Sequence, residues 1–397
     1  MSPSSRRLTL CSLAVPWEEA VATGQYNVLQ ARALRDHGWD VQLFKPVPRF
    51  PHSVTRRSAA AARWARHPER YELDGIPVYA PKVRFAFVPQ VRFGLARISP
   101  ASLALWFRRA VQPHFDAHLA SAKPTALVLH STMPWGSLRP ERPHVFIDRS
   151  WRDAVAWSRQ PRTRHVIAGY LKRSQGHFTS GRTLQDVFSA CFPDQGTEYL
   201  PNGVVTPRDD QFRQPRPRHW EGSFVILCVG SYLERKGHRV LVDAVASLAR
   251  DDPVRLVLVG EPPQELSRLI HERGIADRID VLPRLPQADL LQYMVWADLF
   301  ALPSWAEAFG NVYAEAMAAG TPVVLTSESG MAREITHGQH GWIVEPRSVE
   351  HLRDALVEAL DTDLSAMGSE AQRFVNAAFS WERNAERLTQ ALDGEGR

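Results

Sequence analysis

Short apolar runs alternate with stretches of helical period along the chain, most regularly in its second half. Six runs there are rich in β-branched residues and have the length of buried strands, and five stretches between them repeat apolar residues at helical spacing. The predicted strands are residues 224–230, 254–260, 279–285, 298–304, 322–327 and 341–345, and the predicted helices are 238–250, 264–273, 287–296, 311–319 and 349–360. This alternation predicts a parallel, doubly wound sheet that binds its ligand at the carboxyl ends of its strands.

The first half has a similar but less regular pattern. Its predicted strands are residues 8–15, 41–45, 77–83, 126–131, 144–148 and 198–201, and its predicted helices are 26–37, 99–120, 152–174 and 182–192. The segment 207–220 is rich in Pro and Arg, as is typical of a linker between domains. A chain of 397 residues also exceeds what one core usually holds. The sequence therefore predicts an α/β protein with two Rossmann-like domains, 1–205 and 206–379.

Cysteine content and hydropathy limit the cellular compartments in which we expect this protein. The three cysteines are far apart and form no CxxC pair, which argues against a disulfide framework and against a zinc site. No apolar run approaches the ~20 residues of a membrane span, and residues 8–15 are too short for the core of a signal peptide. We expect a cytoplasmic protein that is neither secreted nor integral to a membrane.

Charge is divided unequally between the two halves. Residues 1–205 hold 28 Lys or Arg against 14 Asp or Glu, whereas the remainder of the chain is acidic. The basic clusters comprise Arg56, Arg57, Arg63, Arg66, Arg70, Arg84, Arg92, Arg97, Arg108 and Arg109, interleaved with Trp64, Phe85, Phe87, Phe93, Trp106 and Phe107. Such a surface suits an anionic membrane or a lipid-linked acceptor. The alternative is an arginine-rich solvated face, and nucleic acid is not expected because no known binding motif accompanies the charge.

The most informative motif is the pair Glu307 and Glu315, which flanks the start of a predicted helix. That helix begins near Asn311 and ends before Gly320. Its unpaired first-turn donors are the backbone N–H groups of Phe309, Gly310, Asn311 and Val312. These groups favour an anion such as a diphosphate, and the carboxylates on either side suit hydroxyl groups. A nucleotide sugar has this layout; the alternative is an acidic first turn that merely stabilises its own helix.

A second motif follows the first predicted strand of this half, in the run from Gly230 to Gly237. Lys236 and Arg235 lie just before a predicted helix, where cations are unfavourable unless an anion lies between them and the helix. A diphosphate would supply that anion. Lys236 is the only lysine in the second half, which suits a phosphate ligand, although a solvated basic turn is the alternative.

The run from Glu307 to Pro322 closely resembles the E-x7-E signature of the GT4 family of retaining glycosyltransferases. The resemblance implies the GT-B architecture, in which two Rossmann-like domains face a central cleft. The N-terminal domain would then bind the acceptor, the domain 206–379 would bind the nucleotide sugar, and a terminal helix, 380–397, would pack back on the N-terminal domain. It also implies that Glu307 holds the transferred sugar, Glu315 the ribose, and Lys236 the diphosphate, without a metal ion.

Other positions match the family less closely. The segment that begins at Gly24 is similar to the glycine loop of GT4 enzymes, which implies that Gly24 faces the donor diphosphate across the cleft. Arg284 and Leu285 lie where relatives bind the nucleobase. His130 and Asp148 follow two predicted strands and are candidates for sugar or acceptor contacts. Two departures are notable, since relatives often have Arg in place of Ser231 and His in place of Asp148. Residues 48–52 and 74–79 resemble a GT4 branch that acts on cell-surface polysaccharides.

From these observations we predict a retaining glycosyltransferase that transfers a hexosyl group from a nucleoside-diphosphate sugar to a glycan, lipid-linked or small-molecule acceptor. No cofactor or metal is expected, because the one D-x-D motif, Asp361-Thr362-Asp363, starts a polar helix, where Asp is a good cap. Peripheral contact with the inner face of the membrane is expected if the basic half binds lipid. The alternatives are a GT-B nucleotide-sugar epimerase and a non-catalytic nucleotide-sugar-binding protein.

Overall fold

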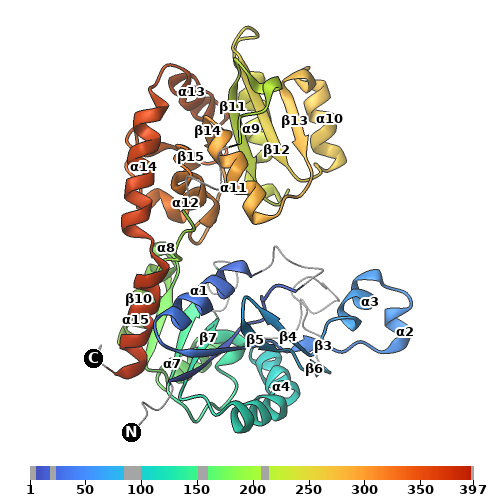
Figure 1. Ribbon diagram of the computed structural model, residues 1–397, viewed down its shortest axis with the longest axis vertical. Helices are drawn as coiled ribbons and strands as arrows, with labels where there is room; N and C mark the ends of the chain where they lie inside the picture. The colour runs from blue at the N-terminus through green and yellow to red at the C-terminus, as the bar shows by residue number, and fades with distance from the viewer. Residues whose placement is uncertain (1–5, 18–23, 85–99, 151–159, 207–213, 395–397) are drawn as a thin grey trace. The chain divides into compact units, whose positions relative to one another are not determined.

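The chain forms two compact units, residues 1–203 with 381–397 and residues 204–380. The computed structural model describes residues 6–17, 24–84, 100–150, 160–206 and 214–394 (Figure 1). The sequence-based boundaries were 205/206 and 379/380, within two residues of these divisions. Each unit is an α/β fold around a predominantly parallel sheet, which confirms the predicted fold class.

The C-terminal unit contains a six-stranded parallel sheet in the order β13-β12-β11-β14-β15-β16. The strands are β11 (Phe224–Val229), β12 (Val254–Val259), β13 (Ile279–Leu282), β14 (Leu299–Ala301), β15 (Val323–Thr326) and β16 (Gly341–Val344). Helix α9 (His238–Ala246) lies beside α10 (Gln264–Glu272) and α13 (Val349–Leu360), whereas α12 (Asn311–Ala318) lies beside α11 (Gln287–Trp296) and α14 (Leu364–Ala378). These two groups of helices are what a doubly wound sheet requires, and one continuous apolar core fills the unit.

The N-terminal unit contains an eight-stranded sheet in the order β10-β9-β8-β7-β1-β2-β5-β4. Its strands are β1 (Arg7–Cys11), β2 (Asp40–Phe44), β4 (Arg70–Leu73), β5 (Ile76–Tyr79), β7 (Ala126–His130), β8 (His144–Asp148), β9 (Gly176–Thr179) and β10 (Thr197–Tyr199). A separate two-stranded sheet pairs β3 (Val47–Pro48) with β6 (Lys82–Val83), and the short helices α2 (His52–Thr55) and α3 (Ala59–Ala65) lie between them in sequence.

Alternating side chains of the N-terminal sheet supply two separate apolar cores. Leu8, Leu10 and Val128 belong to one cluster, which α1 (Gln25–Asp36) and α15 (Trp381–Asp393) complete. Cys11 and Leu129 point into the other, which is completed by α4 (Pro100–Ala122), α5 (Thr132–Trp135), α7 (Pro161–Leu171) and α8 (Arg182–Cys191). This alternation follows from the two-residue period of a strand.

The terminal helix α15 packs along α1 in the N-terminal unit, where the family resemblance placed the end of the chain (Figure 1). Gln30 donates to Asn384 at 2.6 Å, and the Trp39 indole donates to Thr389 at 2.9 Å. The preceding helix, α14, is capped by Asp363, whose carboxylate accepts from the backbone N–H groups of Ser365 and Ala366. The D-x-D motif thus has the capping role that the sequence suggested.

Several predictions of elements in the N-terminal unit were wrong. Strands β4 and β9 were not predicted, and β4 is antiparallel to β5, joined to it by a turn in which Asp74 and Gly75 both have positive φ. The predicted strand 77–83 is instead two strands that belong to different sheets. The first part of the predicted helix 152–174 lies outside the described residues, and α7 begins at Pro161, a residue well suited to the first helical position.

Candidate functional site

The two most informative motifs of the sequence follow adjacent strands at the centre of the C-terminal sheet. From β11 the strand order runs to β12 and β13 on one side, and from β14 it runs to β15 and β16 on the other. Connections after β11 and β14 therefore diverge, which opens a crevice at the carboxyl ends of these strands. Lys236 lies in the connection after β11, and Glu307 lies in the connection after β14.

The connection after β11 is held against the connection after β14 by a glycine. Gly237 has φ 73°, and a Cβ atom there would lie 2.3 Å from the carbonyl oxygen of Pro303. Only glycine permits this approach without displacing the backbone. On the opposite side of this connection, the Tyr232 hydroxyl donates to the carbonyl of Gly260, which directly follows β12, at 2.9 Å. The short 3-10 turn Glu234–Lys236 is thereby placed beside Glu307.

Glu307 is the centre of a compact charged cluster. Its Oε1 atom accepts hydrogen bonds from Arg235 Nη1 at 2.8 Å and from Lys236 Nζ, and Ser304 Oγ lies 2.9 Å away. The side chains of Glu307 and Lys236 are 15% and 14% exposed, so this pairing is partly shielded from water. Burial alone would raise the pKa of Glu307, but the charges and hydrogen bonds of Lys236, Arg235 and Ser304 together lower it. Glu307 is therefore ionised, and the cluster carries one net positive charge.

Helix α12 begins at Asn311, four residues after Glu307, as the sequence predicted. Gly310 is its N-cap, with φ 89° in the left-handed region, and Tyr313 N–H donates to the Gly310 carbonyl at 3.0 Å. The Tyr313 hydroxyl donates to the Leu302 carbonyl at 2.6 Å, which ties the first turn of the helix to the end of β14. Phe309 is buried, with its ring 5.1 Å from that of Phe379. The first-turn N–H groups of the helix thus have a fixed position close in sequence to the cluster.

Of the remaining predicted donor-binding residues, Glu315, Arg284 and Leu285 lie farther along the same unit, whereas Gly24 lies in the N-terminal unit. Glu315 is on α12 and is buried, at 7% exposed. The strand predicted to reach Leu285 ends at Leu282, so Arg284 and Leu285 belong to the following connection, two strands away from β11. Arg284 is exposed and Leu285 is half-buried. The structure therefore brings Arg235, Lys236 and Glu307 into contact, and their proposed roles stay predictions.

A second polar cluster lies at the corresponding point of the N-terminal sheet. The order reverses there between β1 and β7; Gly24 and Arg149 follow β1 and β8, and His130 is the last residue of β7. His130 is buried, and its Nε2 atom lies 2.7 Å from Gln30 Oε1. His130 Nδ1 is also buried and has no hydrogen-bond partner among the described residues. Burial, and then the charge of Arg149, lower the pKa of His130 well below its usual value, so the ring is neutral.

Arg149 is the cation of this second cluster. Its Nη1 atom donates to Asn27 Oδ1 at 2.7 Å, whereas its Nε and Nη2 atoms are buried without a hydrogen-bond partner in the described part of the chain. Burial lowers the pKa of Arg149 to about 9, an effect that Tyr26 partly offsets. Asn27 in turn donates to Ser12 Oγ at 2.9 Å and to the Ala14 carbonyl. A buried guanidinium with two such unpartnered nitrogens is well suited to an anionic ligand.

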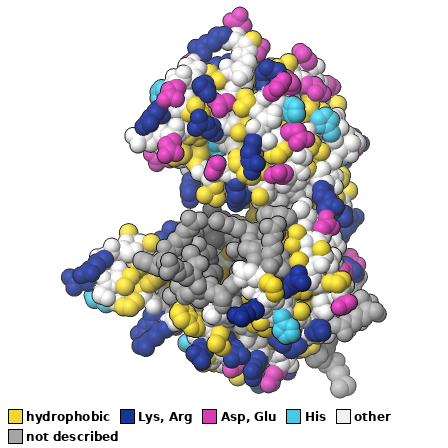
Figure 2. Space-filling model, turned by 180° about the vertical axis from the view of Figure 1, so that it is seen from behind, with side chains coloured by type: hydrophobic (Ala, Val, Ile, Leu, Met, Phe, Trp, Pro, Cys, Tyr) yellow, Lys and Arg dark blue, Asp and Glu magenta, His cyan; other side chains and the backbone are white. Residues whose placement is uncertain are grey.

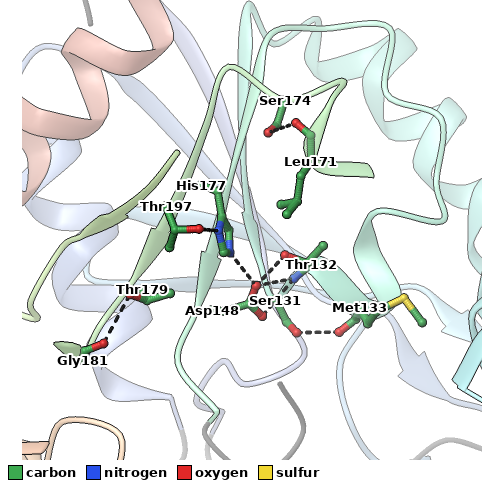
Figure 3. Close-up of polar contacts among 10 residues, drawn as sticks. All are labelled: Ser131, Thr132, Met133, Asp148, Leu171, Ser174, His177, Thr179, Gly181 and Thr197. Atoms are coloured by element: carbon green, nitrogen blue, oxygen red, sulfur yellow. Dashed lines mark hydrogen bonds and ion pairs between the residues drawn. The ribbon is translucent and has the colours of Figure 1, made fainter. Parts of the chain in front are cut away.

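The carboxylate of Asp148, the neighbouring candidate, forms its polar contacts within the N-terminal unit (Figure 3). Its carboxylate accepts from Thr132 N–H at 3.1 Å, from the Thr132 hydroxyl, and lies 3.0 Å from His177 Nε2. It is only 3% exposed. This geometry favours a structural role for Asp148 over a sugar contact. The sequence analysis did not select Arg149, Asn27 or Gln30, although a charged residue directly after a buried strand was the signal for Arg149.

Comparison with known proteins decides the family. The model of the family Glycosyl transferases group 1 matches residues 209–381. A GDP-mannose-dependent alpha-(1-6)-phosphatidylinositol monomannoside mannosyltransferase of Mycobacterium tuberculosis (strain ATCC 25618 / H37Rv) is 32% identical over 262 residues, which are 61% of this chain and 67% of that protein. This chain belongs to that glycosyltransferase family.

Two further comparisons agree. A D-inositol 3-phosphate glycosyltransferase of Nocardia farcinica (strain IFM 10152) is 37% identical over 207 residues, 49% of this chain and 44% of that protein. The solved structure of sucrose-phosphate synthase from Thermosynechococcus elongatus superposes with a TM-score of 0.73 at 21% identity and covers 97% of this chain and 98% of that one. The predicted GT4-type resemblance, GT-B fold and nucleotide-sugar glycosyltransferase function are confirmed, and neither alternative function finds support.

Two findings concern metals and membranes. Within the described residues, no three His, Cys, Asp or Glu side chains come close enough together to hold a metal ion. None of the helices that the structure describes has the length and hydropathy needed to cross a bilayer.

Proposed function

We propose that this glycosyltransferase transfers mannose from GDP-mannose to a phosphate-bearing, lipid-linked acceptor at a membrane surface, with retention of anomeric configuration. The observation that carries the proposal is the cluster of Arg235, Lys236 and Glu307 ahead of helix α12. The choice of donor is supported by relatives named as GDP-mannose-dependent mannosyltransferases. Retention is the expectation that accompanies the GT4 resemblance.

In this proposal the C-terminal unit stabilises the departing diphosphate. Lys236 and Arg235 supply two positive charges, of which Glu307 neutralises one, and the first turn of α12 adds N–H donors and the positive end of its dipole. Fixed donors and charges of this kind are worth most in the transition state, where the phosphate oxygens gain negative charge. Glu307, held by three donors, is oriented to accept from a hydroxyl group of the transferred sugar, and Glu315 is assigned to the ribose.

The acceptor is assigned to the N-terminal unit, at Arg149 and His130. The relatives named above act on phosphatidylinositol monomannoside or on D-inositol 3-phosphate, and these acceptors share a phosphate group. The Nε and Nη2 atoms of Arg149, which have no partner within the described residues, match phosphate oxygens in charge and in geometry. His130 is neutral, and because its Nε2 atom donates to Gln30 Oε1, the Nδ1 atom, which has no partner among the described residues, is suited to accept from an acceptor hydroxyl.

Membrane contact is supported by a basic groove beside helix α4. Two adjoining hollows of about 680 and 520 Å³ share Arg108, Arg139 and Glu141 in their walls, and Asp116 also lines the larger one. Their further cations are Arg109, Arg142 and Arg173. On the same helix Leu105 is 38% exposed and Trp106 is 47% exposed. An interfacial tryptophan and leucine flanked by arginines fit the headgroup region of an anionic bilayer.

Charge on the visible surface agrees with this assignment. Figure 2 shows Lys and Arg side chains spread over the visible face of the N-terminal unit among hydrophobic ones, with few Asp or Glu. Arg92, Arg97, Phe85, Phe87 and Phe93, which the sequence placed in the same basic region, lie outside the described residues. We accordingly propose a location at the inner face of the cytoplasmic membrane. A polysaccharide acceptor, suggested by the resemblance of residues 48–52 and 74–79, stays a prediction.

The proposal is tested by measuring nucleoside-diphosphate release from GDP-mannose, UDP-glucose and ADP-glucose, with and without vesicles that contain phosphatidylinositol monomannoside. Acceptor-dependent GDP release and an α-linked product by NMR are expected. Preference for another donor by more than tenfold would correct the assignment of the base. Absence of acceptor-dependent release with every donor would refute the proposed donor and acceptor together.

A further inference from the structure

Three consecutive carbonyl groups after β1 each accept a hydrogen bond from a side chain of a different element. The pairs are Ala14 with Asn27 Nδ2 on α1, Val15 with Lys45 Nζ directly after β2, and Pro16 with the Tyr71 hydroxyl on β4. The distances for Val15 and Pro16 are 2.7 and 2.9 Å. Backbone in a connection normally bonds to water or to its own turn, so a row of carbonyls bound by three distant side chains is a specific arrangement.

Lys45 is the most unusual member of this row, because it is only 2% exposed. Its Nζ atom also lies 3.0 Å from His67 Nε2 and 5.5 Å from the centre of the Trp64 ring. His67 Nδ1 is 2.7 Å from the Pro68 carbonyl and must donate to it, which leaves Nε2 as the acceptor for Lys45. In the described part of the chain no carboxylate pairs with this lysine. Burial accordingly lowers the pKa of Lys45 to about 7.

A buried lysine without a counter-ion is destabilising, and an apolar side chain would fill the same space at less cost. The rings of Trp17, Trp64 and Tyr71 pack around His67, the neighbour of Lys45, with ring centres of Trp17 and His67 4.5 Å apart. What an apolar replacement could not do is bind the Val15 carbonyl. The polar contact is therefore the property that distinguishes lysine at this position.

The row of carbonyls is also the surface on which α1 begins. A Cβ atom at Gly24 would lie 2.0 Å from the Ala14 carbonyl oxygen, so the N-cap of α1 packs directly on the row. Asn27, which binds the Ala14 carbonyl, is the residue that receives the hydrogen bond from Arg149. A shift of residues 14–16 would therefore move both Gly24 and the partner of the proposed phosphate ligand.

We propose that Lys45 and Tyr71 are positioning residues for the acceptor: they hold the carbonyls of Val15 and Pro16 and thereby set the place of Gly24, Asn27 and Arg149. This inference rests on the proposed function, because it assumes that the acceptor binds at Arg149. It assigns no contact between Lys45 and any substrate. Its consequence is a specific loss of acceptor affinity when either side chain loses its donor.

The test compares Lys45→Met and Tyr71→Phe, which keep the volume and remove the donor, with Lys172→Met, an exposed lysine in the same unit. Acceptor KM and kcat are measured with GDP-mannose, GDP affinity is measured by calorimetry, and amide hydrogen exchange is followed by mass spectrometry. We expect acceptor KM to rise about tenfold in Lys45→Met, the factor that corresponds to one lost hydrogen bond, and less in Tyr71→Phe. GDP affinity should stay at its wild-type value, since GDP is assigned to the other unit.

Exchange should quicken in residues 12–17 and 24–28 while β1 and β2 keep their protection. The double variant should lose less than the product of the two single losses, because the two contacts hold one segment. Unchanged acceptor KM in both variants, or exchange that quickens equally through the whole sheet, would overturn the inference. If the wild-type enzyme itself shows no acceptor-dependent transfer, the proposed function has failed instead.

Discussion

Replacement of Glu307 by glutamine separates the charge of this side chain from its shape. In the wild-type protein one oxygen, Oε1, accepts from Arg235, Lys236 and Ser304. Glutamine can present a carbonyl oxygen at the same place, but it leaves two cations facing a neutral group. We expect the variant to fold and to bind GDP more tightly than the wild type, because the cations lose their competing carboxylate.

The effect on transfer should be much larger and of opposite sign. If Glu307 orients the sugar and the two cations, its loss should resemble the loss of one preorganised donor in an oxyanion hole, about 2.7 to 4 kcal/mol, which lowers kcat by roughly 10² to 10³. The effect on stability should be smaller. Loss of a fully buried pair costs about 3 to 5 kcal/mol, but the Lys236 side chain is 14% exposed and the Arg235 side chain 39%, so we expect about 1 to 2 kcal/mol.

Three measurements check this expectation: kcat from GDP release, GDP affinity by calorimetry, and the free energy of unfolding in urea. Glu272→Gln, an exposed carboxylate on α10, serves as the matched control and should leave all three unchanged. A Glu307→Gln enzyme that keeps more than a tenth of wild-type kcat would refute the assigned role. A variant that loses GDP binding and transfer in parallel would show that the carboxylate is needed to build the site rather than to act in it.

Three further predictions address other parts of the molecule. Gly237→Ala should lower the free energy of unfolding by about 2 kcal/mol or more in urea titrations and reduce kcat, because the new methyl group would lie 2.3 Å from the Pro303 carbonyl; wild-type values would contradict the required close approach. Lys45 has a folded-state pKa of about 7, below its unfolded value, so the folded protein binds fewer protons than the unfolded chain between pH 7 and 10. The free energy of unfolding should therefore rise with pH in that window. Lys45→Met should flatten this rise, and an identical slope in both proteins would argue against a buried charge. Arg149→Met should raise acceptor KM at least tenfold while it leaves stability unchanged or improved, since it removes two unpaired buried donors; a large loss of stability at unchanged KM would show that Arg149 is structural.

The fold was predictable where each strand is followed by one helix. In the C-terminal unit the predicted and observed bounds of α11 and α13 coincide, because apolar residues recur at helical period in both, and Ser348 also caps α13 with a side-chain hydrogen bond. The N-terminal unit was harder for a physical reason. Strand β9 has only four residues, begins with glycine, and has polar side chains at every second position, so its sequence resembles a loop. Strand β4 is an edge strand with exposed Arg70 and Glu72, and its pairing depends on a turn rather than on apolar burial.

The candidate site was predictable to a similar extent. Lys236 and Glu307 could be found because each belongs to a motif whose local geometry, a glycine turn or the start of a helix, is determined by neighbouring residues. Asp148 and Arg149 could not be ranked in this way. Their roles depend on which of two adjacent side chains turns toward His177 in β9, a strand the sequence did not reveal, and which turns toward Asn27 on α1. A partner 20 or more residues away leaves no local signal.

The two clusters have a common origin in sheet topology, and this bears on how the enzyme balances charge. In each unit the cation follows a strand at or next to the point where the strand order reverses, and a polar side chain contacts it there, Glu307 for Lys236 and Asn27 for Arg149. The cluster around Glu307 has one net positive charge, whereas Arg149 has a full positive charge and no acidic partner among the described residues. A donor diphosphate carries about two negative charges and a phosphodiester acceptor carries one. The C-terminal cluster together with the α12 dipole approaches the first requirement, and the lone buried guanidinium meets the second. The difference between the two sites in carboxylate content therefore supports the proposed assignment of donor to one unit and acceptor to the other. An acidic residue introduced as the partner of Arg149, as in Asn27→Asp, should abolish acceptor binding while GDP affinity is retained.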